Sequence, residues 1–294
     1  MFGHRPDGVR LKKVDPIILL TPYLMPMRCD AQVFVNKEVD MEPLTRYIAE
    51  KSNEGVKVTF MELIIAAYIR GISQHPACNR FITNRRMYAR KDLIVAFAEL
   101  LQTDDGSFNE TIVKIKFDPT DTIFDVARRV EQNIEANRNA QEANGTLALA
   151  RILSNASILC RGMVGLVNFL DHHELIPKAL CELSPFHASM YITNMASIGM
   201  TSVNHHIYNF GTVSQFFSLG LPNKAFAVQK DGSTKLKRSL PIGAVADERV
   251  CSGAEYAQLF AEMLRCLRDP HLLETPPEKV VYDEGVVISV PKPQ

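Results

Sequence analysis

Two segments in the first quarter of the chain have the apolar spacing and the end signals of helices. Pro43 suits the first turn of a helix over Met41–Lys51. Thr59 and Glu62 form a capping-box pattern at the start of 61–73. This second segment is apolar on nearly every side, which is typical of a buried helix. We therefore expect two helices here, the second one in the core.

Apolar runs that alternate with polar residues, or that end at turn residues, predict strands in both halves of the chain. The hairpin turns between them fall at Asp104-Asp105-Gly106, Pro222-Asn223 and Asp231-Gly232. The expected strands cover 31–36, 90–100, 109–117, 189–194, 212–219, 225–229 and 235–246.

Two further helices complete the pattern. Thr122 and Asp125 form a weaker capping-box pattern that opens a helix to about Asn137. The segment 254–267 places its apolar residues on one face and ends before Asp269-Pro270. Helices early and strands late, with a terminal helix after a glycine, favour a single-domain α+β sandwich. The polar, proline-rich stretch 1–27 predicts an arm lying over the core, which would span 28–294.

Composition excludes several classes of protein. The 294 residues contain 33 basic and 33 acidic side chains, so no basic excess is present to hold nucleic acid or an anionic membrane. A hydrophobic fraction of 46% with 22% charged residues is ordinary for a globular protein. Six scattered cysteines and a polar N-terminus predict reduced thiols, a cytoplasmic location and no zinc site.

The most apolar stretch, 147–170, raises the question of membrane contact. It contains Arg151, Asn155, Arg161 and Asn168, so it falls short of a run of about 20 apolar residues. We expect a helix packed on the domain or at an oligomer contact, with interfacial membrane contact as the minor alternative.

Polar and small residues that could carry chemistry gather in three places: 191–199, 204–209 and 247–254. All three follow or join predicted strands, where a rigid scaffold presents reactive side chains. The chain reads I-T-N-x-x-x-x-G over 192–199, D-x-R-V-x-x-G-A over 247–254 and D-P-x-x-L over 269–273.

In this order, and with the D-G hairpin between them, these motifs resemble the catalytic core of the 2-oxo acid dehydrogenase acyltransferases, which shares its fold with chloramphenicol acetyltransferase. The resemblance covers roughly Arg28 to Leu273. It implies a two-layer α+β sandwich, with a mixed sheet, helices on one face and a helical insertion at about 139–185. It also implies a coenzyme A thioester as co-substrate and a homotrimer whose active sites lie between subunits.

The chain departs from the family at the motif D-H-R-V-x-D-G, whose histidine is the general base. Glu248 stands at the histidine position and Ser252 at the second aspartate, whereas Asp247, Arg249 and others match. The family's Ser/Thr that binds the tetrahedral oxyanion falls on Thr193.

Glu248 is poorly suited to act as the base. A carboxylate lies about 4 pKa units below a thiol, which makes proton transfer unfavourable by roughly 5.7 kcal/mol. Burial would raise the glutamate pKa and repair the mismatch. The alternative is a loop residue that forms an ion pair with Arg249 or another cation.

A histidine pair offers a second candidate base. By family register, His205 lies where related acetyltransferases line their acceptor pocket. Strand alternation would place His205 with Val203 on one face and His206 on the other. A relocated base at His205 with Thr193 as oxyanion donor is the first interpretation, and two structural histidines at a subunit contact are the alternative.

Two other features that could suggest a reactive or metal site are expected to be structural. Asp171-His172-His173-Glu174 looks like a metal cluster, but adjacent helical residues point apart, so a solvated helix end is expected. Cys251 is expected to be a small packed thiol. Fewer than 30 residues precede the resemblance, so we expect no lipoyl domain in cis and no role as the ordinary core of a giant complex.

The sequence thus supports two functions. The first is an acyltransferase that moves an acyl group from coenzyme A to a small-molecule alcohol, amine or thiol. The second is an inactive trimeric scaffold or acyl-CoA-binding relative.

Overall fold

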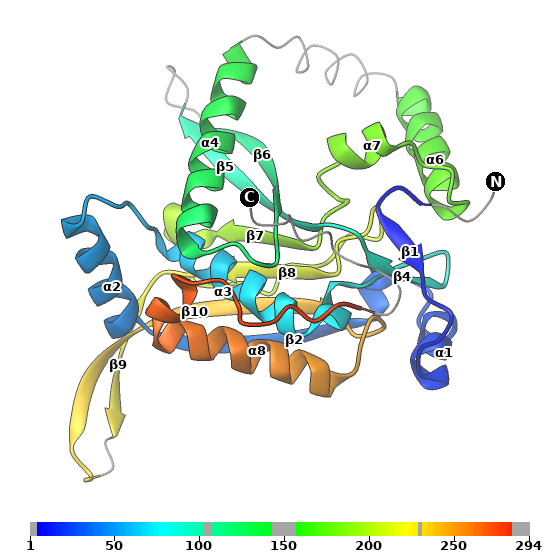
Figure 1. The fold of residues 1–294 in the computed structure, drawn as a ribbon. Helices are drawn as coiled ribbons and strands as arrows, with labels where there is room; N and C mark the ends of the chain where they lie inside the picture. The colour runs from blue at the N-terminus through cyan, green and yellow to red at the C-terminus, as the bar shows by residue number, and fades with distance from the viewer. Residues whose placement is uncertain (1–4, 103–107, 143–156, 229–230, 284–294) are drawn as a thin grey trace.

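The computed structural model describes residues 5–102, 108–142, 157–228 and 231–283 (Figure 1). Within these ranges the chain forms a seven-stranded mixed sheet in the order β2-β10-β8-β7-β5-β6, with β9 paired to the first half of β10. The strands are β2 (Gln32–Asp40), β5 (Leu93–Gln102), β6 (Phe108–Phe117), β7 (Met190–Asn194), β8 (Gln215–Leu219), β9 (Asn223–Val228) and β10 (Thr234–Asp247).

Strand β5 is parallel to β7 and antiparallel to β6, but the two pairings differ in length. Residues 95–97 pair with 190–192 of β7, whereas pairing with β6 continues to Gln102. Strand β7 runs beside β8 up to Asn194. Strands β5 and β7 therefore part beyond Phe97, inside an otherwise continuous sheet.

Four helices pack together on one face of the sheet (Figure 1): α2 (Met41–Asn53), α3 (Phe60–Gln74), α4 (Ile123–Glu142) and α8 (Gly253–Arg268). Helix α3 begins at the predicted capping box, in which the Glu62 amide donates to Thr59 Oγ1 and the Thr59 amide to Glu62 Oε2. Its residues 62–73 are buried, as predicted. Ser252 and Glu255 form a second capping box at α8. The predicted α+β sandwich with helices on one face is confirmed.

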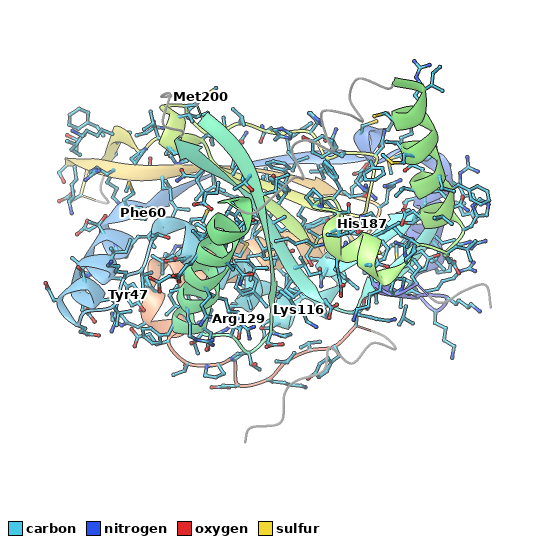
Figure 2. All side chains as sticks on the ribbon, turned by 90° about the horizontal axis from the view of Figure 1, so that it is seen from above. Tyr47, Phe60, Lys116, Arg129, His187 and Met200 are labelled. Atoms are coloured by element: carbon cyan, nitrogen blue, oxygen red, sulfur yellow. The ribbon has the colours of Figure 1, made fainter. Side chains whose placement is uncertain are left out.

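The other face of the sheet has a smaller apolar layer, formed by Ala96, Tyr191, Phe216 and Val245 under loop residues of 188–213. In Figure 2, Tyr47 and Arg129 mark the helical side, and Met200 lies on the opposite side. Side chains that line a break in the sheet can therefore come from both layers.

A three-stranded sheet at one end of the molecule contains β1 (Gly8–Arg10), β4 (Arg86–Arg90) and β3 (Phe81–Thr83), in that order. The strand expected over 90–100 is confirmed from Leu93 onward as β5, but its start differs, because Arg90 ends β4 and β5 begins at Leu93. The β3–β4 turn consists of Asn84 and Arg85, with φ of 47° and 59°. Glycine usually marks such turns, so the hairpin was not predicted.

Other expected segments have mixed outcomes. The stretch 1–27 includes β1 and helix α1 (Pro16–Leu24), which the sequence did not predict. Helices α6 (Ser157–His172) and α7 (Lys178–Leu183) follow the undescribed residues 143–156. The turn at 104–106 also lies outside the described residues. Within the described ranges, no helix combines the length and apolar character needed to cross a bilayer.

Candidate active site

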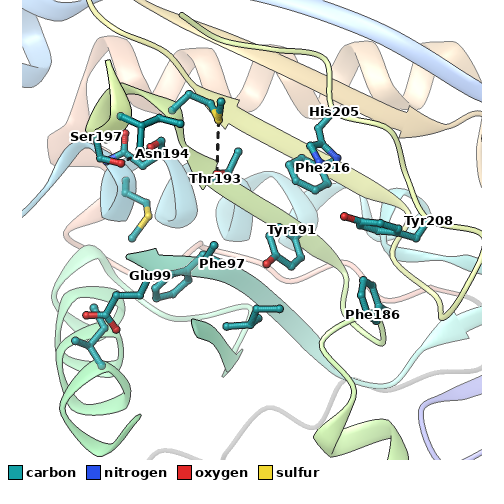
Figure 3. A pocket seen from close by; sticks show the side chains of 16 residues that line it. Phe97, Glu99, Phe186, Tyr191, Thr193, Asn194, Ser197, His205, Tyr208 and Phe216 are labelled. Carbon is teal, nitrogen blue, oxygen red and sulfur yellow. Dashed lines mark hydrogen bonds between the residues drawn. The ribbon is translucent and has the colours of Figure 1, made fainter. Parts of the chain in front are cut away.

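A cavity of about 720 Å³ opens where β5 and β7 part (Figure 3). Met61 of α3 and Ile134 of α4 line it from the helical layer, and Tyr191 and Phe216 line it from the opposite layer. The cavity therefore reaches through the break in the sheet. The other side chains that line it belong to Phe97, Ala98, Glu99, Ile112, Phe186, Thr193, Asn194, Met195, Ser197, Ile198, His205 and Tyr208.

His205 is half-buried and lines this cavity, and its imidazole has a defined orientation. The ring stacks on Phe216, with centroids 4.2 Å apart and planes 11° apart (Figure 3). Its Nδ1 lies 2.8 Å from the backbone carbonyl oxygen of His206. Because a carbonyl oxygen only accepts, Nδ1 carries the proton, and the Nε2 of the neutral ring keeps its lone pair. His205 is thus held in the tautomer that a general base requires.

Thr193 lies in the same cavity, at the end of β7. Its Oγ1 has a single weak partner in the described structure, the sulfur of Met195 at 3.9 Å (Figure 3). Thioether sulfur is a poor acceptor, so the hydroxyl hydrogen is available to a stronger one. One chain therefore brings both Thr193 and His205 to one cavity.

Sequence reasoning singled out the segment 191–199 but missed two of its polar residues as part of the cavity wall. Asn194 precedes a short 3₁₀ turn (Met195–Ile198) and Ser197 lies within it. Both line the cavity, and Ser197 Oγ donates to the Asn194 carbonyl at 2.7 Å. Gly199, with a φ of 79°, ends that turn. The concentration of small and polar residues in 191–199 was the sequence signal that could have identified Asn194 and Ser197 as site residues.

No known family model and no curated protein sequence matches this chain. Solved structures do match it. One is a probable dihydrolipoamide acetyltransferase from Listeria monocytogenes, with a TM-score of 0.54 and 11% identity over 88% of this chain and 94% of that chain. A second is the dihydrolipoamide acetyltransferase of Azotobacter vinelandii, with a TM-score of 0.52 and 14% identity over 90% and 94%. Chloramphenicol acetyltransferase matches with a TM-score of 0.50 and 9% identity over 88% and 99%.

The chain has the chloramphenicol acetyltransferase-like fold. The resemblance drawn from the I-T-N and D-x-R-V motifs is thereby confirmed at the level of fold. The TM-scores to these three structures establish the architecture of the chain, whereas identities of 9–14% leave its chemistry to be argued from its own residues.

Glu248 lies outside the cavity in this acyltransferase-like fold. Its side chain is exposed, and its backbone amide donates to the carbonyl of Ala31 at 2.9 Å. The expected ion pair with Arg249 is wrong, because Arg249 binds Asp247 instead. Within a single chain, Glu248 is not buried, and it is not among the residues that line the cavity containing Thr193.

The matching residues of the motif form a buried ion-pair network. Arg249 donates Nε to Asp247 Oδ1 at 2.8 Å and Nη2 to Oδ2 at 2.7 Å. Arg28 Nε lies 3.4 Å from the same carboxylate, and the Tyr256 hydroxyl donates to the Asp247 carbonyl. Arg249 also binds the carbonyls of Met25 and Pro26. Through these contacts, Asp247 and Arg249 connect the end of β10 to residues 25–28 and to α8.

The segment that carries the two histidines is not a strand, so the expected alternation of side chains fails. The rings of His205 and His206 stack with centroids 4.5 Å apart instead of pointing to opposite faces. Ser218 Oγ holds this segment by accepting from the Val203 amide and donating to the Val203 carbonyl. Irregular backbone between β7 and β8 therefore positions His205.

The remaining candidates, the acids of 171–174 and Cys251, are buried in contact with other side chains. Asp171 and Glu174 are buried beside Arg5 and Arg86, so the expectation of a solvated helix end is wrong for both acids. The described residues contain no group of three or more His, Cys, Asp or Glu able to hold a metal. Cys251 is buried with its sulfur 3.6 Å from that of Cys78, and this contact together with burial raises its thiol pKa.

Proposed function

We propose that this chain is a coenzyme A-dependent acyltransferase, in which His205 is the general base and Thr193 binds the oxyanion. The observation that carries the proposal is the single cavity lined by both His205, whose Nδ1 is bound to the His206 carbonyl, and Thr193, whose hydroxyl has only a weak thioether partner. The acyltransferase-like fold is consistent with it.

In the proposed reaction His205 first accepts and then returns a proton, and Thr193 stabilises the intermediate. His205 Nε2 removes a proton from the alcohol, amine or thiol acceptor, which attacks the thioester carbonyl carbon. Thr193 donates a hydrogen bond to the oxyanion that forms. When the intermediate collapses, the C–S bond breaks, and the coenzyme A thiolate takes the proton from the imidazolium. An imidazole lies only about 2 pKa units below a thiol, whereas a carboxylate lies about 4 below.

The shape of the cavity supports a reaction between two substrates. Its volume of about 720 Å³ is typical of small-molecule sites. Met61 and Ile134 line it from one layer and Tyr191 and Phe216 from the other, so it extends through the sheet and offers room for both a donor and an acceptor.

Glu248 remains an alternative base only in an oligomer. We propose a homotrimer, following the resemblance, and there the exposed carboxylate of one subunit would face the cavity of another. The same exposure favours the second candidate function, an inactive scaffold that binds acyl-CoA, because the motif histidine is missing and Glu248 does not replace it within its own chain.

The test measures coenzyme A release from acetyl-CoA with alcohol, amine and thiol acceptors. We expect turnover above background that falls strongly in Thr193→Val, which removes the hydroxyl and keeps the shape. Turnover that survives His205→Ala but is lost in Glu248→Gln would move the base to Glu248. Acetyl-CoA binding without turnover in wild type, by titration calorimetry, would establish the scaffold instead.

A further inference from the structure

A second, smaller cavity of about 230 Å³ lies on the other side of the segment that follows His205. Residues 209–211 form one wall, the tip of the β3–β4 hairpin another, and the start of the core a third. The charged and hydroxyl-bearing side chains that line it are those of Arg28, Thr83, Arg85, His172 and Arg249, together with one carboxylate, Asp171. The proposed acyl transfer uses none of them.

Buried positive charge surrounds this cavity. Arg5, Arg28, Arg90 and Arg249 are each at most 4% exposed. The carboxylates that neutralise them are Asp171 and Asp247, also buried, and the half-buried Asp7. This basic cluster therefore has one more cation than carboxylates, before the exposed Arg85 at the rim is added.

Arg90, which belongs to the basic cluster but does not itself line the cavity, carries the unbalanced charge. Its guanidinium donates to the hydroxyl and the carbonyl of Thr212 and lies over the ring of Phe81, without a carboxylate partner among the described residues. Burial lowers its pKa to about 10, although the charge of Asp7 acts in the opposite direction. A buried cation without a counterion is costly, and a bound anion nearby would offset that cost.

A buried hydroxyl without a partner also points to a ligand. Thr83 is only 4% exposed, it lines the cavity, and its Oγ1 has no hydrogen-bond partner among the described residues. A buried hydroxyl usually has a partner. Directly after it, the Asn84-Arg85 turn has positive φ at both residues and brings the Arg85 guanidinium to the rim.

We propose that this cavity binds a phosphate group or a similar tetrahedral oxoanion, with Thr83 and Arg85 as direct donors inside the field of Arg28 and Arg249. A tetrahedral oxoanion offers several acceptor oxygens to donors that converge from different elements. Arg28 connects the cavity to the first site, because it donates to the carbonyls of Tyr208 and Gly211 in the segment that carries His205.

Two ligands would supply this chemistry: free inorganic phosphate, or a phosphate group of a larger molecule such as coenzyme A. Isothermal calorimetry on the full chain, at constant ionic strength, compares inorganic phosphate, coenzyme A and pantetheine, which has no phosphate. The variants are Arg85→Ala and Thr83→Val. Arg46→Ala, at an exposed arginine on α2, is the matched control.

We expect saturable binding of phosphate or coenzyme A that weakens about tenfold in Arg85→Ala and roughly fivefold in Thr83→Val. Arg46→Ala should bind as wild type does. Weakening for inorganic phosphate identifies the free anion, and weakening for coenzyme A alone, with pantetheine unaffected, identifies a phosphate of the larger ligand. Wild-type affinity for both ligands in both variants, or no binding of either ligand, would overturn the proposal. These results do not depend on turnover, so they are distinct from the test of acyl transfer.

Discussion

The imidazole of His205 lies flat against the ring of Phe216, with 4.2 Å between centroids and 11° between planes. This contact joins a residue of an irregular segment to a buried residue of β8, in the middle of the sheet. Since the Nδ1 of His205 is held by the His206 carbonyl, the stack and the hydrogen bond together fix where Nε2 points. Phe216 is therefore a positioning residue for the proposed base.

Phe216→Leu should loosen that ring while keeping the site apolar. We expect kcat for coenzyme A release to fall roughly tenfold with little change in KM, because orientation and not binding is lost. The free energy of unfolding should fall by only about 1 kcal/mol. Phe226→Leu is the control, since Phe226 is 75% exposed on the β9 ribbon. An unchanged kcat in Phe216→Leu would show that the stack does not position the base.

The ion pair between Asp247 and Arg249 leads to a prediction about stability. Asp247→Asn should lower the free energy of unfolding by about 3 to 5 kcal/mol, because it leaves Arg249 and Arg28 buried without a carboxylate. Glu248→Gln, one residue away and exposed, should change it by less than about 0.5 kcal/mol. Urea denaturation measures both. Equal losses of stability in the two variants would contradict a structural role for the ion pair between Asp247 and Arg249.

The burial of Lys114 should make the free energy of unfolding depend on pH. Its Nζ donates to the carbonyls of Cys181 and Ser184, and burial lowers its pKa to about 8 from its usual 10.5. Between these values the unfolded chain binds more protons than the folded chain, so the stability contributed by this group rises with pH. Below pH 8 both states are protonated, and the cost of burying the charge is present in full.

Lys114→Met removes this titration. Wild type should therefore gain stability relative to Lys114→Met as the pH rises from about 8 to 10.5, and the difference should be constant below pH 7. Urea denaturation of both proteins at several pH values in this range gives the difference directly. A difference that stays flat, or that moves against wild type with rising pH, would contradict the buried cation.

Local signals in the sequence predicted much of the fold. The capping box at Thr59, the apolar helix after it and the strands on both sides of the D-G hairpin follow from spacing and end residues alone. The β3–β4 hairpin was missed because Asn84 and Arg85 take positive φ without glycine. Helix α1 was missed because four of its apolar residues are exposed and Pro22 lies within it, so no clear amphipathic pattern marks it.

The candidate site was predictable only in part. The motifs led to Thr193, and the histidine pair led to His205, and the structure places both at one cavity. Their environment depends on tertiary contacts that spacing does not encode: the break between β5 and β7, and the stacking of His205 on Phe216. The predicted ion pair between Glu248 and Arg249 was also wrong because it depends on tertiary structure. Arg249 binds Asp247, the carboxylate that is buried.

The rate of coenzyme A release by His205→Ala, compared with His173→Ala, tests the catalytic proposal most directly. The two histidines are closely matched: each donates Nδ1 to a backbone carbonyl at 2.8 Å and stacks on a phenylalanine, but only His205 lines the cavity. We predict a loss of at least about 100-fold in His205→Ala, as expected for a general base, and a rate near that of wild type in His173→Ala. Equal rates in the two variants would contradict the assignment of His205 as the base.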